Sequence, residues 1–229
     1  MAHIERKLTW CVIDLDTKAG FVFLQLRWQY VWAVQGTLPA WTLKEKRHFH
    51  NTADRAIWAS WSNRVTLNVA GTSSFARTFA TRPVTVNLDV RWVTNDPHWT
   101  VTVTKIPADA LATSSVQWNA RTITLDSNDI VPRERCLVAA GPVATPGGSP
   151  PMVCYKQIPV AHEFGHAAGN TAVLSRGDEY YAGHSHEADA TSMMNIGNDL
   201  RNRHFTTIVD ELNQMVPNTT FSVAQIKTR

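Results

Sequence analysis

The sequence lacks a long hydrophobic run. None of its 229 residues lies in an apolar stretch of the roughly 18 residues that a membrane-spanning helix requires, so no membrane span is expected. Residues 1–10 include basic side chains but neither a long apolar core nor a small-residue cleavage site. We therefore expect no secretory signal peptide, and we expect the chain to be made in the cytoplasm.

An excess of charge of one sign is also missing. Lysine and arginine number 22 against 19 aspartate and glutamate residues, which gives a net charge of +3. The basic residues are scattered along the chain, whereas nucleic-acid-binding proteins gather them in a patch or stripe. We therefore expect no nucleic-acid partner.

Cysteine is scarce, and three residues leave at least one unpaired. Cys136 and Cys154 flank a segment rich in proline and glycine. A disulfide between them would stabilise the fold by about 3 kcal/mol through chain entropy and would indicate an oxidising compartment. Two ordinary buried thiols are an equally good interpretation of the same spacing.

The residues that are present suffice for a substantial core. Hydrophobic residues make up 44% of the chain and charged residues 18%, which argues against global disorder. At this length we expect a single domain over residues 1–229, with a sheet-rich part over residues 1–156 and a catalytic part over residues 157–229. All nine tryptophans precede residue 119, which favours packing in the sheet and core over a ligand groove.

Local patterns predict the strands. Apolar, aromatic-rich runs over residues 8–14 and 21–33 are separated by a polar turn and predict a β-hairpin. Alternation of apolar and polar residues predicts strands over residues 84–92 and 99–105. A further strand is expected over residues 121–125.

Two helices are predicted outside the motif described next. Thr42 and Glu45 form a capping box, and apolar residues recur at helical spacing from there to residue 61. His48 and His50 are two residues apart on this helix and point in different directions, so we interpret them as surface residues. Residues 208–215 predict a late helix.

The chemistry is concentrated in His-Glu-Phe-Gly-His at residues 162–166. Histidines at positions i and i+4 lie on one helix face, where His162 and His166 can both bind a tetrahedral Zn²⁺. Glu163 leans toward the same site without ligating the metal, as a general base and then a general acid requires. The motif therefore predicts a zinc hydrolase in which Glu163 assists attack by a zinc-bound water.

A third protein ligand is expected, because two histidines do not hold a catalytic zinc ion. Residues 162–169 read His-Glu-Phe-Gly-His-Ala-Ala-Gly and resemble the opening of the metzincin signature. In that signature the glycine turns the chain toward a ligand, usually a histidine, three residues further on. That place is Ala172 here, which cannot bind a metal, so the sequence departs from the signature.

Asp178 is the first choice for this third ligand. Gly-Asp-Glu-Tyr at residues 177–180 is similar to the Asp-Glu-Tyr element of bacterial zincins that place aspartate in the third position. Tyr181 has the spacing from Asp178 of a tyrosine in aspzincins. The open alternatives are Glu179, His184, His186 and His204.

Two later segments extend the resemblance. Ser-Met-Met-Asn at residues 192–195 resembles the metzincin Met-turn, whose methionine packs beneath the zinc histidines, and Met194 is the matching residue. Leu-Arg-Asn-Arg-His-Phe at residues 200–205 is similar to a stretch of metallopeptidase effectors attached to type VI secretion spikes and related contractile injection systems. That resemblance implies a secretion-spike or injection-system carrier, with delivery outside the cell or into a target cell, the periplasm included. In that setting His204 or Tyr180 is expected to hydrogen-bond the oxyanion of the tetrahedral intermediate.

The expected fold is α+β and zincin-like, with a twisted mixed sheet, an active-site helix and a mostly irregular C-terminal part. An edge strand over residues 84–92 or 99–105 is expected to border the cleft and to bind an extended peptide. The expected function is a zinc-dependent metallopeptidase, a secreted toxin or effector, acting on a peptide or protein substrate. The alternatives are a zinc amidase acting on peptidoglycan or another non-protein amide, and a non-catalytic binding module with structural zinc.

Overall fold

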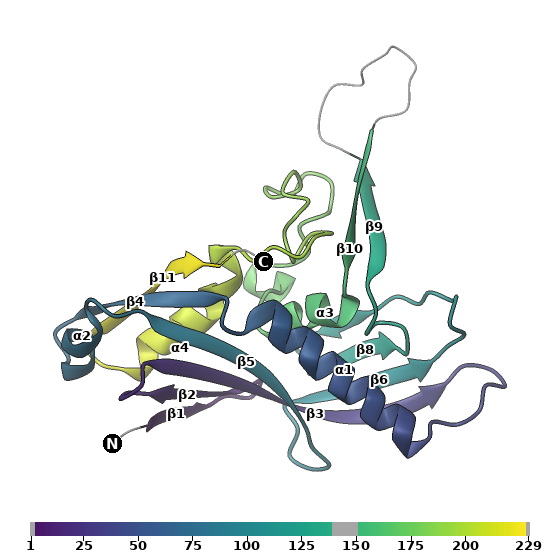
Figure 1. The fold of residues 1–229 in the computed structure, drawn as a ribbon, viewed down its shortest axis with the longest axis horizontal. Helices are drawn as coiled ribbons and strands as arrows, with labels where there is room; N and C mark the ends of the chain where they lie inside the picture. Colours follow the sequence, from purple (N-terminus) through teal and green to yellow (C-terminus); the bar gives the residue numbers. More distant parts are fainter. Residues whose placement is uncertain (1–2, 139–150, 228–229) are drawn as a thin grey trace.

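A twisted mixed sheet of nine strands is the main element of the structure (Figure 1). The computed structural model describes residues 3–138 and 151–227, and the statements below concern these residues. The main strand order is β11-β4-β5-β3-β6-β8-β7, and β2 pairs with β3 and with β1. The strands are β1 (His3–Lys7), β2 (Val12–Asp16), β3 (Phe21–Val34), β4 (Val65–Gly71), β5 (Val84–Trp92), β6 (Trp99–Lys105), β7 (Ser115–Gln117), β8 (Thr122–Asp126) and β11 (Thr219–Ile226).

The 14-residue strand β3 organises this sheet. Its first half forms the expected hairpin with β2 and pairs in parallel with β5, while its second half pairs in parallel with β6. Every second residue from Val22 to Trp28 is fully buried, because strand side chains alternate between the two faces. Each half of β3 therefore has one parallel neighbour, β5 or β6, and the apolar, aromatic composition of the strand suits that pairing.

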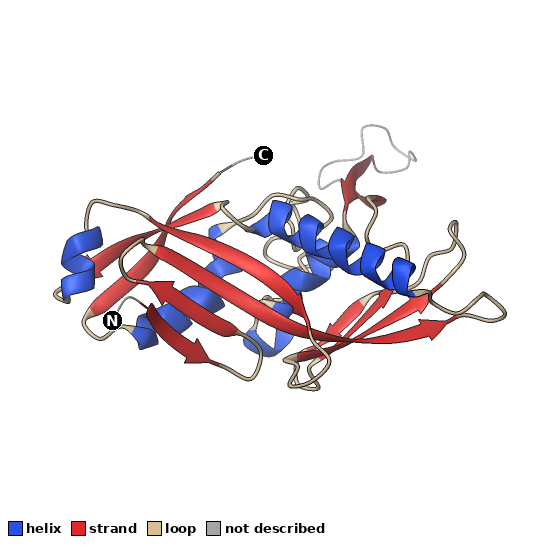
Figure 2. Cartoon of the chain, turned by 60° about the horizontal axis from the view of Figure 1, so that its bottom comes forward, coloured by secondary structure: helices blue, strands red, loops and turns tan. Residues whose placement is uncertain are grey.

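Four α-helices occur in the described part of the chain: α1 (Leu43–Trp61), α2 (Ser74–Phe79), α3 (Pro159–Ala167) and α4 (Thr206–Met215). The capping box of Thr42 and Glu45 is present at the start of α1, as predicted. Figure 2 shows α1 lying along the sheet, and its buried side includes Phe49, Ile57 and Trp61. None of the helices among these residues is both long and apolar enough to cross a bilayer.

The fold class is α+β with a core that is mostly sheet, as expected. The helix predicted over residues 208–215 is α4, which starts two residues earlier. The strands predicted over residues 84–92 and 99–105 are β5 and β6.

Several expectations are corrected. In the strand order β6 lies between β3 and β8, and the first residues of β5 lie between β3 and β4, so neither is a terminal strand of the sheet. The terminal strand beside the α3 helix is the short β7. Alternation identifies a strand but says nothing about its neighbours. The hairpin begins at Val12 rather than at residue 8. The C-terminal part is mostly irregular between α3 and α4, as expected, but β11, which pairs with β4, was not predicted.

His50 is a further correction, because it is not a plain surface residue. Its Nδ1 lies 3.1 Å from the hydroxyl of Tyr30, and its ring makes edge contacts with Tyr30 and Trp92. Burial lowers the pKa of His50. By contrast, His48 is exposed as expected.

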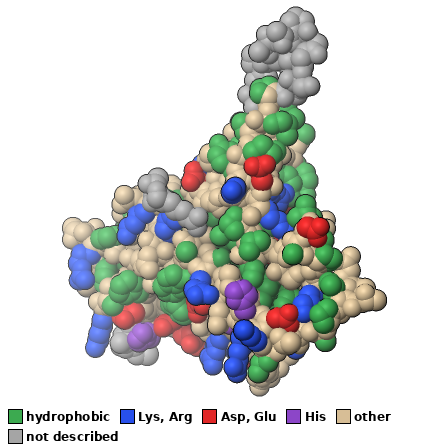
Figure 3. Space-filling model, turned by 45° about the vertical axis from the view of Figure 1, so that its right-hand side comes forward, with side chains coloured by type: hydrophobic (Ala, Val, Ile, Leu, Met, Phe, Trp, Pro, Cys, Tyr) green, Lys and Arg blue, Asp and Glu red, His purple; other side chains and the backbone are tan. Residues whose placement is uncertain are grey.

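A separate two-stranded hairpin rises from the body next to α3 (Figures 1 and 3). Its strands are β9 (Arg133–Val138) and β10 (Met152–Gln157). Cys136 and Cys154 are partners in its register and form a disulfide, while Cys11 is free and buried. Residues 139–150, which include most of the proline- and glycine-rich segment, lie outside the described residues.

The α3 helix is held against α1 by close packing. Trp61 at the end of α1 donates a 2.9 Å hydrogen bond from Nε1 to the carbonyl of Ala161, and its ring lies 5.8 Å from that of Phe164. A Cβ atom on Gly165 would lie 2.6 Å from Sδ of Met194 and 2.7 Å from Cζ2 of Trp61. Glycine at this position therefore allows the helix to approach both neighbours.

Substitution of Gly165 tests this packing. Glycine to alanine inside a helix normally stabilises by about 1 kcal/mol, but overpacking costs about 1–3 kcal/mol. We expect Gly165→Ala to lower the free energy of unfolding in a urea titration. Gly177→Ala is the control, because its Cβ would approach no atom closer than 3.3 Å. A Gly165→Ala protein as stable as the parent would contradict the close approach.

Candidate metal centre

The two histidines of the motif are oriented by their Nδ1 atoms. Pro159 opens the α3 helix, and His162 and His166 follow one turn apart on it. Nδ1 of His162 lies 2.7 Å from the carbonyl oxygen of Met193, and Nδ1 of His166 lies 2.5 Å from that of Asn170. A carbonyl oxygen only accepts, so each Nδ1 carries a proton, and each Nε2 faces the Asp178 carboxylate. With Nδ1 held in this way, Nε2 is the atom left to bind a metal once it has lost its own proton.

Asp178 completes a group of three ligand atoms. Its Oδ1 lies 2.9 Å from Nε2 of His162 and 3.1 Å from Nε2 of His166, and the two Nε2 atoms are 3.2 Å apart. Bonds of about 2.0–2.1 Å to a tetrahedral Zn²⁺ place its ligand atoms about 3.3 Å apart. The three atoms therefore fit one face of a zinc tetrahedron.

The charges of this group are coupled. Burial alone would raise the pKa of Asp178, but hydrogen bonds and charge from His162 and His166 outweigh burial and hold it far below its ordinary value. Burial would lower the pKa of His166, but the hydrogen bond and charge of Asp178 raise it. A divalent cation would take over the balancing role that the histidine protons have here.

Glu163 lies beside these ligands with a carboxyl group that is almost wholly buried. Burial raises the pKa of Glu163, and the nearby charges of His162 and His166 reduce that effect only in part. Tyr180 is the other expected catalytic residue near the group, with its ring 6.4 Å from that of His162. Burial raises the pKa of Tyr180, and the negative charge of Asp178 adds to the effect.

Gly169 and Asn170 turn the chain after the helix. Gly169 has a φ of +103°, and a Cβ there would lie 2.5 Å from Oγ1 of Thr207, so only glycine fits. The side-chain amide of Asn170 donates to the carbonyls of Gly165 and His204, which fixes the backbone oxygen that His166 uses. The helix stop expected at these two residues is thus also the support of the second histidine.

The segment expected to form a Met-turn lies directly under the helix. Met194 is buried with its sulfur against Gly165, and the preceding residue, Met193, supplies the carbonyl that holds His162. Gln157 was not anticipated from the sequence. Its buried Nε2 lies 2.7–3.1 Å from the carbonyl oxygens of Met193, Asn195 and Gly197.

An ion-pair network fixes the loop that carries Asp178. Glu179 is buried and receives two hydrogen bonds from Arg203, at 2.6 and 2.8 Å, and its backbone N–H donates to the carbonyl of Met194. Arg203 also reaches Asp189, which pairs with Arg201. The Glu179 carboxylate is therefore paired with Arg203 and is directed away from His162 and His166.

The other alternative ligands also lie apart from the centre. Nδ1 of His204 accepts from the Arg201 backbone, its Nε2 lies 3.1 Å from Oγ of Ser192, and the side chain is buried. His204 is therefore outside the three-residue group, and the oxyanion role expected for it stays a prediction. His184 and His186 contact each other in the preceding loop and are absent from the three-residue group.

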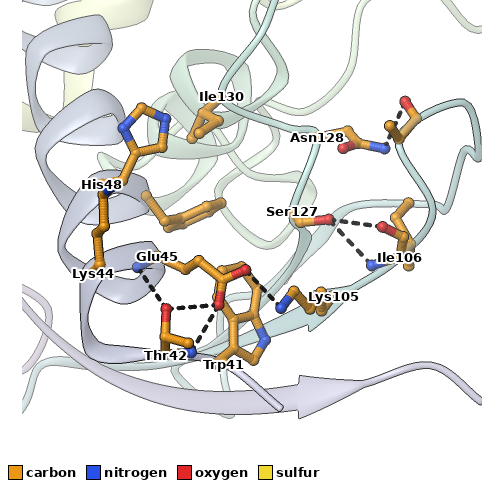
Figure 4. A pocket seen from close by; sticks show the side chains of 12 residues that line it. Trp41, Thr42, Lys44, Glu45, His48, Lys105, Ile106, Ser127, Asn128 and Ile130 are labelled. Atoms are coloured by element: carbon orange, nitrogen blue, oxygen red, sulfur yellow. Dashed lines mark hydrogen bonds and ion pairs between the residues drawn. The ribbon is translucent and has the colours of Figure 1, made fainter. Parts of the chain in front are cut away.

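A cavity of about 550 Å³ opens at the start of α1 (Figure 4). None of His162, His166 and Asp178 lines it. Its polar groups are paired with one another: Glu45 with Lys105 and Thr42, and Ser127 with the backbone of Ile106. No group of metal-ligating residues lines it in the part of the chain described.

No protein-family model, curated protein or solved structure matches this chain.

The ligand group predicts an order of metal affinities. Asp178→Ala, His162→Ala and His166→Ala are each expected to weaken zinc binding by more than about 100-fold, since even supporting residues of a zinc site contribute 10- to 100-fold. Glu179→Gln is expected to have a smaller effect, and His184→Ala none. Competition with a chromophoric chelator measures each affinity, and circular dichroism checks folding. Full affinity in Asp178→Ala would exclude it as a ligand.

Proposed function

We propose that this protein is a zinc-dependent metallopeptidase of zincin-like fold, with His162, His166 and Asp178 as zinc ligands. The observation that carries the proposal is the triangle of two imidazole nitrogens and one carboxylate oxygen at 2.9–3.2 Å, with the buried Glu163 beside it. Each histidine has its Nδ1 held by a backbone carbonyl, which leaves Nε2 for a metal, and the carboxylate would balance part of the metal's charge.

A bound zinc ion supplies a Lewis acid that polarises the substrate carbonyl and lowers the pKa of a coordinated water to about 7. Glu163 is placed to take a proton at its carboxylate and to give it to the leaving nitrogen. Its burial raises its pKa toward the working pH, which suits a group that must both accept and donate. In this proposal Tyr180, whose ring lies 6.4 Å from that of His162, is the hydroxyl donor for the developing oxyanion.

The ligand group also bears on the alternative of a binding module with structural zinc. Structural zinc sites are closed by four protein ligands, usually with cysteine. Among the described residues the group at the histidines has three members, and Cys136 and Cys154 are bonded to each other. An open fourth position favours catalysis.

Glu163→Gln separates catalysis from metal binding. We expect this variant to keep one zinc per chain by elemental analysis and to lose about 10²- to 10⁴-fold in turnover, the usual contribution of a general acid–base group. The assay is cleavage of a fluorogenic peptide library with and without chelator. Near-normal turnover would show that Glu163 is not the base.

The same library distinguishes the two hydrolase candidates. Chelator-sensitive cleavage of peptides supports the peptidase. Inertness toward every peptide, together with chelator-sensitive release of products from peptidoglycan, would instead support the amidase.

The disulfide favours an oxidising place of action, since such bonds do not persist in a reducing cytosol. We therefore extend the proposal to an effector delivered by a secretion-spike or injection-system carrier and acting in the periplasm of a target cell.

Expression in a bacterium, with and without an added periplasmic signal, tests this extension. We expect growth inhibition only by the exported protein, and none by exported Glu163→Gln. Toxicity unchanged by Glu163→Gln would exclude hydrolysis as its cause.

A further inference from the structure

The β9–β10 hairpin has two unlike faces. Because side chains alternate along a strand, residues 133, 135 and 137 share one face with their partners 157, 155 and 153. At the base of this face Arg133 pairs with the buried Asp126, and Gln157 is buried against the Met-turn. The opposite face, which carries the disulfide, is exposed along its length. The first face is therefore the one turned toward the metal centre.

Arg135 is the next residue up this inner face. Its guanidinium lies 5.2 Å from the ring centroid of Tyr180, which borders Asp178 and His162. Its charge also acts on Glu163, where it lowers the pKa. Arg135 thus extends from the hairpin over the edge of the catalytic group.

Among the described residues, this arginine has no anionic partner of its own. Most of the other arginines around the centre are occupied: Arg133 by Asp126, Arg201 by Asp189, and Arg203 by Glu179. Within residues 3–138 and 151–227, Arg135 makes no hydrogen bond or ion pair. The cation–π contact of its guanidinium is with the Tyr180 ring. Five N–H donors in a planar fork are therefore free beside the site.

We propose that Arg135 is a specificity residue that binds a carboxylate of the substrate, so that the preferred substrates are peptides with an acidic group within about three residues of the scissile bond. A guanidinium matches the geometry of a carboxylate with two parallel hydrogen bonds. The group is either an acidic side chain or a chain-terminal carboxylate. The inference rests on the proposed hydrolase function, because it takes the metal centre as the place of cleavage.

The hairpin is built to hold this residue in place. Cys136 follows Arg135 directly, and its disulfide to Cys154 ties the two strands together one position above. Below, β10 leads through Ile158 into the α3 helix. The β9–β10 hairpin and the two histidine ligands are therefore joined by one continuous stretch of backbone. Beyond Arg135 the inner face continues with Tyr155, Leu137 and Val153, an apolar wall for the rest of an extended chain.

Binding to a catalytically silent protein tests the proposal without depending on turnover. The probes are fluorescein-labelled alanine hexapeptides, C-terminally amidated, with glutamate placed at each position in turn and a glutamine partner for each. A second pair compares a free with an amidated C-terminus, which separates the two sources of carboxylate. Dissociation constants are measured by anisotropy on zinc-loaded Glu163→Gln.

We expect glutamate, at one or two adjacent positions, or the free terminus, to bind about 10- to 100-fold more tightly than its neutral partner, as for a hydrogen bond to a charged group. Arg135→Gln in the same background should abolish that difference while leaving the neutral peptides unchanged. Lys156→Gln is the matched control, because it removes one positive charge from the outer face of the same hairpin.

Three results would overturn the proposal. One is equal binding of acidic and neutral peptides by the Glu163→Gln protein. Another is a preference that survives Arg135→Gln, and the third is equal losses in Arg135→Gln and Lys156→Gln, which would indicate only long-range attraction. A further test makes Arg135→Gln in the parent protein. Equal losses of kcat on acidic and neutral substrates would show that Arg135 acts on Glu163 and not on the substrate. Absence of any hydrolysis by the parent would count against the peptidase alone, since the binding comparison stands without it.

Discussion

The hydrogen bonds to Nδ1 of His162 and His166 are the constraint on which the rest of the site depends. Both acceptors are backbone carbonyls, at Met193 and Asn170, and neither lies in the helix that carries the histidines. Each carbonyl is fixed in turn by a buried amide, Gln157 under the Met-turn and Asn170 itself at the helix end. The irregular segment after α3 is therefore a positioning device, and its backbone atoms matter as much as its side chains.

The local features were predictable because their causes are local in the chain. A capping box, strand alternation and two histidines four residues apart each express the geometry of one element, and all three are found as predicted. Asp178 was a choice among alternatives, and the structure brings it to His162 and His166 while Glu179, its neighbour, pairs with Arg203.

The features that were missed depend on partners distant in sequence. Nothing in residues 84–105 reveals that β5 and β6 lie inside the sheet, since the strands that cover them come from residues 65–71 and 122–126. Gln157 ends a strand and supports a turn 36–40 residues later, and no local pattern indicates that role. His204 has an imidazole in the segment 200–205 that resembles metallopeptidase effectors. Its burial against Ser192 and Glu179 depends on the folded loop.

The order of the strands also has a consequence for biosynthesis. Strand β4 pairs with β5 through only three residues, and its whole outer edge is covered by β11, the last strand of the chain. Until residues 219–226 leave the ribosome, that edge presents bare backbone donors and acceptors next to Val65, Leu67 and Val69, side chains that are buried in the finished fold. A nascent chain stalled after residue 205 would thus hold every candidate ligand and still expose a surface open to intermolecular strand pairing.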